Sequence, residues 1–99
     1  MSTLSKRTGE SILFDFEFST RMAEGDTLAS LDSVTQTLED GSVTTDLTID
    51  GFVASGTRGQ ARIAGGTDQV CYYLVAEGTT ARGDTIQVTG RLELSDTVK

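Results

Sequence analysis

The clearest alternation of apolar and polar positions lies near the start of the chain, in residues 11–19. Every second position there is apolar, namely Ile12, Phe14, Phe16 and Phe18. Because successive side chains of a β-strand point to opposite faces, a period of two predicts a half-buried strand. Three of the four phenylalanines lie in this segment, so its inner face is expected to supply a large part of the core.

Shorter segments of the same kind follow, separated by turn-forming residues. The Asp40-Gly41 pair predicts a tight turn, and Asp50-Gly51 predicts a bend or bulge. Residues 70–76 are apolar at successive positions, which is typical of a central strand covered on both faces, and the last two strands are expected to form a hairpin. The further strands are predicted at residues 28–38, 43–49, 52–54, 60–64 and 86–94.

No segment repeats apolar residues at the helical spacing over three turns, and Thr, Val, Ile and Gly disfavour helix. About seven short strands with turn signals every 8–12 residues predict an all-β fold, an immunoglobulin-like antiparallel β-sandwich. We expect residues 10–95 to form this domain. Residues 1–9 and 96–99 are expected to be mobile N- and C-terminal tails.

Charge and composition narrow the classes of function. Fifteen acidic and eight basic residues give a net charge of -7, which repels nucleic acid, and no basic cluster suits a membrane surface. No signal-peptide pattern and no apolar run of about 18 residues is present, so synthesis in the cytoplasm is expected. A single cysteine excludes an internal disulfide, and the absence of His removes the commonest metal ligand.

Five aspartates fall in predicted turns, where carboxylate oxygens can hold calcium. Aspartate also closes turns by accepting a hydrogen bond from the nearby backbone, and this interpretation is favoured because the spacing lacks the Asp-x-Asp-x-Asp pattern of a calcium loop. No metal site is therefore expected. These residues are Asp26, Asp40, Asp50, Asp68 and Asp84.

Catalytic candidates are weaker still. Asp15 and Glu17 share one strand face and could act as general acid and base, but such a face is more often simply solvated. Cys71 has apolar neighbours and no His to activate it, which predicts an inert thiol. The glycine-rich turns at residues 56–59 and 65–66 lack a phosphate-loop pattern. We expect no catalytic, cofactor-binding or metal-binding residue and no enzyme, while Tyr72 is expected to form a structural tyrosine corner.

Four motifs occur in a familiar order: the Gly25-Asp26-Thr27 run within residues 24–30, then residues 64–67, residues 72–75, and Thr79-Thr80 before Gly83. In this order they resemble small structural proteins of tailed bacteriophages, the fiber-tail adaptor or virion-associated immunoglobulin-like family. The resemblance covers residues 11–94. It departs from the family where Arg21-Met22 stands in place of an aromatic residue and where residues 31–34 lack a second tryptophan.

The resemblance implies a non-enzymatic structural component of the virion that docks as an adaptor at the tail, the collar or the fiber attachment site. Its partners would be other virion proteins, in a symmetric multi-copy assembly. The alternatives are a capsid-surface decoration protein and an immunoglobulin-like module that binds carbohydrate or calcium. A further hypothesis is that residues 1–10 are mobile and become ordered on a neighbouring subunit, so that deletion of residues 1–8 would leave the fold intact.

Overall fold

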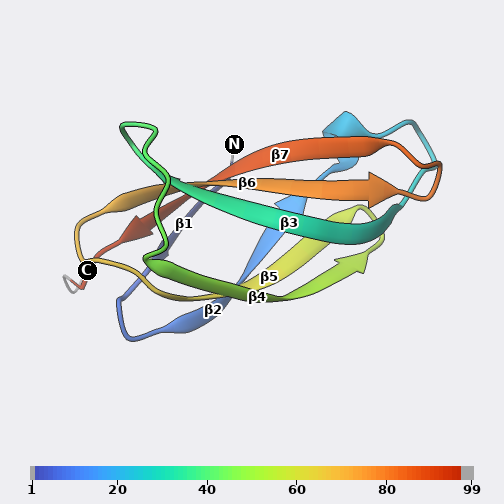
Figure 1. Cartoon of the computed structure of the whole chain (residues 1–99). Helices are drawn as coiled ribbons and strands as arrows, with labels where there is room; N and C mark the ends of the chain where they lie inside the picture. The colour runs from blue at the N-terminus through green and yellow to red at the C-terminus, as the bar shows by residue number, and fades with distance from the viewer. Residues whose placement is uncertain (1, 97–99) are drawn as a thin grey trace.

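In the part of the chain that the structure describes, seven strands form two sheets that pack face to face (Figure 1). The computed structural model describes residues 2–96, and side chains from residue 4 onward. One sheet has the order β1 (Ser2–Lys6), β7 (Thr85–Leu94), β6 (Cys71–Thr80) and β3 (Leu28–Leu38). The other has the order β2 (Ser11–Glu17), β5 (Arg58–Gly65) and β4 (Leu47–Ser55), and a short 3₁₀ turn, η1 (Ser19–Arg21), follows β2.

The strand order is that of an immunoglobulin-like sandwich. In that fold the second, fifth and fourth strands share one sheet, as β2, β5 and β4 do here. The third, sixth and seventh strands share the other sheet, as β3, β6 and β7 do. The expected all-β sandwich is therefore confirmed. One pairing is not antiparallel, because β1 runs parallel to β7.

The core lies between the sheets and uses the inner positions that the alternation predicts. Phe14 and Phe16 are both 2% exposed, and their rings stack with centroids 4.7 Å apart. Phe18 is fully buried although β2 ends one residue earlier. Apart from these three, the buried apolar residues are Leu28, Leu31, Leu47, Ala61, Ile63, Tyr72, Leu74, Ala76, Leu92 and Leu94.

Tyr72 forms the predicted corner between β5 and β6. Its side chain is fully buried, and its hydroxyl accepts a hydrogen bond from the Thr67 backbone N–H at 2.9 Å. The same hydroxyl donates to Asp46 Oδ2 at 3.0 Å. A bond from a tyrosine back to the chain a few residues upstream is the feature that defines a tyrosine corner, so this prediction is confirmed.

The N-terminal segment differs from its expected place outside the domain. Over residues 1–9 the sequence predicts a mobile tail, whereas the structure places Ser2–Lys6 in the sheet, with Ser2 opposite Gly90 and Lys6 opposite Leu94. Lys6 is 2% exposed, and its ammonium donates to the Gly65 carbonyl at 2.8 Å. Burial lowers the pKa of Lys6, and Glu10 and Asp96 oppose that shift.

The expected C-terminal tail, residues 96–99, lies mostly outside the described residues. Asp96 is described, and its Oδ1 accepts a hydrogen bond from the Thr8 backbone N–H at 2.8 Å. Its own N–H donates to Asp68 Oδ1 at 2.8 Å. The first residue of the predicted tail is thus joined to two loops of the domain.

Two predicted strands also need correction. Val43 is 76% exposed and lies in the loop before β4, paired only through an isolated bridge with Thr37, so residues 43–46 form no strand.

Strand β6 is central in its sheet but is covered on one face alone. Alternate residues are buried, while Tyr73 and Val75 on the other face are half-buried because no second layer packs there. The bulge near Asp50-Gly51, the β6–β7 hairpin and the bounds 28–38 are as predicted.

Candidate docking surface

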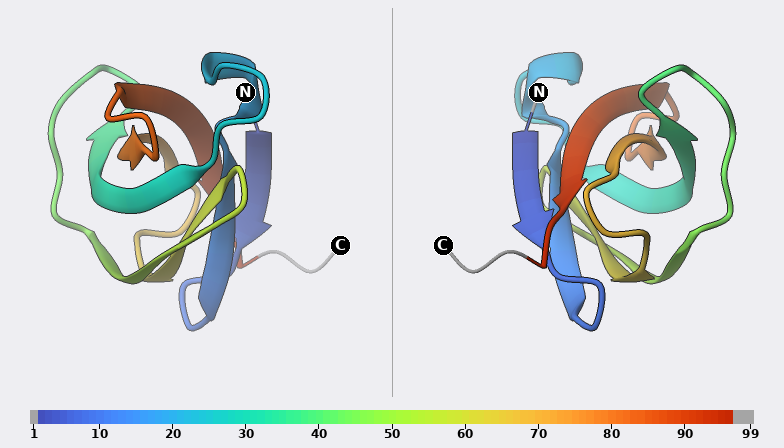
Figure 2. Two further views of the ribbon diagram at one scale, coloured as in Figure 1. Left: turned by 90° about the vertical axis from the view of Figure 1, so that its right-hand side faces the viewer. Right: turned by 90° about the vertical axis from the view of Figure 1, so that its left-hand side faces the viewer.

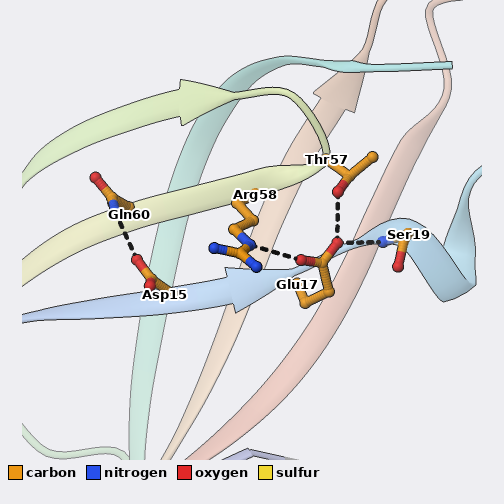
Figure 3. A network of polar contacts seen from close by, with 6 residues as sticks. All are labelled: Asp15, Glu17, Ser19, Thr57, Arg58 and Gln60. Atoms are coloured by element: carbon orange, nitrogen blue, oxygen red, sulfur yellow. Dashed lines mark hydrogen bonds and ion pairs between the residues drawn. The ribbon is translucent and has the colours of Figure 1, made fainter.

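The outer face of the β2-β5-β4 sheet carries an ordered set of polar pairs (Figure 3). Glu17 lies opposite Arg58 in the register, and its Oε2 accepts from Arg58 Nε at 2.9 Å. Its Oε1 accepts from Thr57 Oγ1 at 2.5 Å and from the Ser19 backbone N–H at 3.3 Å. One step along the strands, Gln60 Nε2 donates to Asp15 Oδ1 at 2.7 Å.

These bonds determine what the two carboxylates can do. The Thr57 hydroxyl and then Arg58 lower the pKa of Glu17 to about 2, so Glu17 is an anion at neutral pH. Asp15 and Glu17 share the outer face, as predicted, but each is bonded to its own neighbours on β5 or at the adjoining turns. The two carboxylates are thus members of a hydrogen-bonded polar row on the outer face of the sheet.

The lowered pKa predicts a measurable acid sensitivity. Because the folded-state pKa of Glu17 lies below its ordinary value of 4.5, its contribution is present above that value and is lost as the pH falls from about 4.5 to about 2. Replacement Glu17→Gln should therefore flatten the fall in melting temperature between pH 5 and pH 2.5, which calorimetry would measure. The exposed side chain limits the effect to about 1 kcal/mol or less.

Glu24→Gln is the matched control, because Glu24 is exposed and, within residues 2–96, its carboxylate accepts no side-chain or backbone hydrogen bond and forms no ion pair. It should leave the fall in melting temperature between pH 5 and pH 2.5 unchanged. If Glu17→Gln and the native protein showed the same fall, the bonds of Glu17 to Thr57 and Arg58 would not be maintained in solution.

Apolar side chains are exposed on this same face. Leu13 is 50% exposed and lies opposite Arg62, and Val53 is 52% exposed and lies opposite Gln60, on the other side of β5. Phe52, in the bulge of β4, is 40% exposed. Exposed apolar groups set among ordered hydrogen-bonding groups are the ordinary composition of a protein–protein interface.

Sequence reasoning did not select these residues. Leu13 was detectable, because it is the apolar member of the outward-facing set in residues 11–17. Val53 gave no signal, since the bulge between Asp50 and Val53 interrupts the alternation that would reveal its face.

A groove opens at the side of the sandwich, between β2 and β7. Its volume is about 460 Å³, and it is lined by Phe14–Glu17 of β2, by Thr20 and Arg21 of η1, and by Gln87–Gly90 of β7. Figure 2 shows η1 on the same side of the sandwich as β1, and Figure 1 places η1 past the start of β1, toward the end of the molecule where β7 begins. The groove therefore lies beyond the first residues of β1, where that strand no longer separates β7 from β2.

The predicted turn aspartates are dispersed around the domain. Asp40 Oδ1 accepts from the Ser42 N–H, which closes a turn, and Asp26 Oδ1 accepts from the N–H of the next residue, Thr27. Asp68 receives the Asp96 N–H, Asp84 follows the β6–β7 turn, and Asp50 lies in β4 rather than in a turn. Within residues 2–96, no three His, Cys, Asp or Glu side chains are grouped closely enough to hold a metal ion.

The remaining candidates from the sequence are Cys71 and the glycine-rich turns. Cys71 begins β6 and is half-buried, and burial raises the pKa of its thiol although Arg91 opposes this. The thiol therefore stays protonated at neutral pH, as expected for an inert cysteine. Gly56, Gly65 and Gly66 have positive φ angles at the ends of β4 and β5, where they serve turns that lead into strands rather than into a helix.

In a comparison with models of known protein families, the sequence matches one family over most of its length. The family model described as "Podophage GP4 fiber-tail adaptor protein gp77" matches residues 6–93. A search of curated proteins finds no match. Among the described residues, the structure contains no helix of the length and apolarity that crossing a bilayer requires.

Proposed function

This chain belongs to the podophage fiber-tail adaptor family, and on that basis we propose that it joins a fiber to the tail as a non-catalytic part of the virion. Membership gives it a structural role in the phage particle and other virion proteins as partners. The family description favours the tail over the capsid surface. The net charge of -7 supports protein partners over nucleic acid or an anionic membrane.

The observation that supports docking best is the outer face of β2-β5-β4. Leu13 and Val53 expose about half of their surfaces there, beside the Glu17–Arg58 ion pair and the Asp15–Gln60 bond. These polar side chains already bond to one another, so part of their conformational entropy is lost before a partner covers them. We propose that this face contacts the tail, in several copies arranged by the symmetry of the tail, after synthesis in the host cytoplasm.

A charge placed on this face should prevent docking. Val53→Glu, alone or with Leu13→Glu, puts a carboxylate where an apolar contact is expected, and the amount of adaptor in purified particles should fall at least about tenfold. Both positions are exposed, so the melting temperature of the free protein should change by only a few degrees. Quantitative mass spectrometry of particles assembled with each variant measures incorporation.

Val43→Glu is the matched control, because Val43 is also exposed but lies in the loop before β4 rather than on the sheet. It should be incorporated at the native level. If Val53→Glu and Leu13→Glu were incorporated as well as Val43→Glu, the tail would have to contact another surface. The adaptor role itself has a separate test: particles made without this protein should lack fibers.

A further inference from the structure

Strand β1 covers only half of the outer edge of β7. The register of the pair runs from Ser2 opposite Gly90 to Lys6 opposite Leu94. The first half of β7, from Thr85 to Thr89, pairs with β6 on one side, and no strand formed by residues 2–96 lies on the other. Five residues of strand correspond to about 16 Å of open edge.

The direction of the backbone groups follows from the hydrogen bonds at the end of β7. The Leu94 N–H donates to the Val70 carbonyl, and the Leu94 carbonyl accepts from the Gln69 N–H, so Leu94 faces the β6 side. In an antiparallel pair, residues alternate between facing the partner and facing away. The N–H and C=O groups of Gln87 and the N–H of Thr89 therefore point toward the open edge, whereas the Thr89 carbonyl lies at the first rung of the β1–β7 ladder.

The groove described above lies along this edge. Phe14 and Phe16 form part of its wall, and their rings are held in place by each other and by Gly90. A Cβ added to Gly90 would lie 2.8 Å from Phe14 Cζ, so the glycine is what allows the ring to lie against β7. The wall is packed and fixed, and the groove has the shape of a slot beside unpaired backbone groups.

Charge indicates what could enter the slot. Asp15, Glu17 and Arg21 are among the residues that line the groove, Arg58 of β5 is paired with Glu17, and the whole chain carries -7. A segment of net positive charge is therefore favoured, whereas a second copy of this acidic chain is disfavoured. A fiber that attaches by its end presents few residues to the adaptor. A slot of this kind suits a single extended segment better than a broad surface.

We propose that an extended, net basic segment of the fiber subunit enters this groove and adds a strand to β7, in line with β1, by bonding to the backbone of Gln87 and Thr89. This inference rests on the proposed adaptor function. Strand addition takes its affinity from main-chain hydrogen bonds, so the contact should depend on backbone N–H groups more than on the side chains of β7.

A pair of substitutions at one position tests this dependence. Thr89→Pro removes the N–H that faces the groove and leaves the β6 side of the ladder intact, since proline is tolerated where the lost donor faces an open edge. Thr89→Ala keeps the N–H and removes only the exposed side chain. Particles carrying Thr89→Pro should retain the adaptor but lose fibers at least about tenfold, whereas Thr89→Ala should keep them within about twofold.

Other outcomes would overturn the proposal. Native fiber content in Thr89→Pro particles would show that the groove is not the fiber site, and loss of the adaptor itself would assign the groove to the tail. If Thr89→Pro fails to fold, hydrogen exchange of the native protein decides: the Gln87 and Thr89 amides should exchange fast in the free adaptor and slowly with purified fiber bound. Slow exchange in a self-associated free adaptor would assign the groove to a second copy. Fibers on particles that lack this protein altogether would refute the adaptor function instead.

Discussion

Replacing Phe16 with alanine is expected to lower the free energy of unfolding by about 3–5 kcal/mol. The ring is 2% exposed and stacks on Phe14 between the sheets, so its removal leaves a cavity that packed neighbours cannot fill. A loss of this size is a large part of the total stability of a small domain. Urea unfolding followed by circular dichroism measures it.

Leu13→Ala is the control on the same strand. Leu13 faces outward and is 50% exposed, so its truncation should cost about 1 kcal/mol or less. If Phe16→Ala kept the native unfolding midpoint, the inward face of β2 would be assigned wrongly, together with the packing of both sheets against it.

Deletion of residues 1–8 is expected to destabilise the domain by on the order of 2–4 kcal/mol, or roughly 10–30 °C in melting temperature. It removes the whole β1–β7 pairing and the buried Lys6, and it leaves the Gly65 carbonyl without the Lys6 donor. Leu4, which packs against the core, is lost as well. Thermal unfolding of the truncated protein measures the change.

Complementation provides the control for this deletion. A synthetic peptide of residues 1–10 should bind the open edge of the truncated protein and restore part of the melting temperature, while a peptide of scrambled order should not. A truncated protein as stable as the full chain would instead support the mobile tail that the sequence predicts for residues 1–9.

Some elements were predictable because burial in them is one-sided. The alternation in residues 11–18 places every second residue between two sheets, and the core uses those positions. The bounds 28–38 and the corner at Tyr72 could also be predicted, since turn residues flank β3 and a tyrosine lies near the start of the sixth strand. In each case the signal is local in the sequence.

The missed features depend on distant parts of the chain. Segment Ser2–Lys6 contains one apolar residue, Leu4, so no periodicity marks it, and its partner lies almost ninety residues later. Val43 looks like part of a strand because Val43, Leu47 and Ile49 lie at alternating positions, yet only an isolated bridge to Thr37 joins it to a sheet. The groove could not be predicted either, because it exists only where β1 begins opposite Gly90 rather than opposite an earlier residue of β7.

The parallel alignment of β1 and β7 has a mechanical consequence. A pulling force that enters at the start of β1 and leaves at the end of β7 acts along both strands in opposite directions, so the five residue pairs from Ser2–Gly90 to Lys6–Leu94 are loaded together in shear. In a hairpin pulled at its open end, the pairs would instead separate one after another. A domain loaded through its two ends resists more force in the first geometry than in the second.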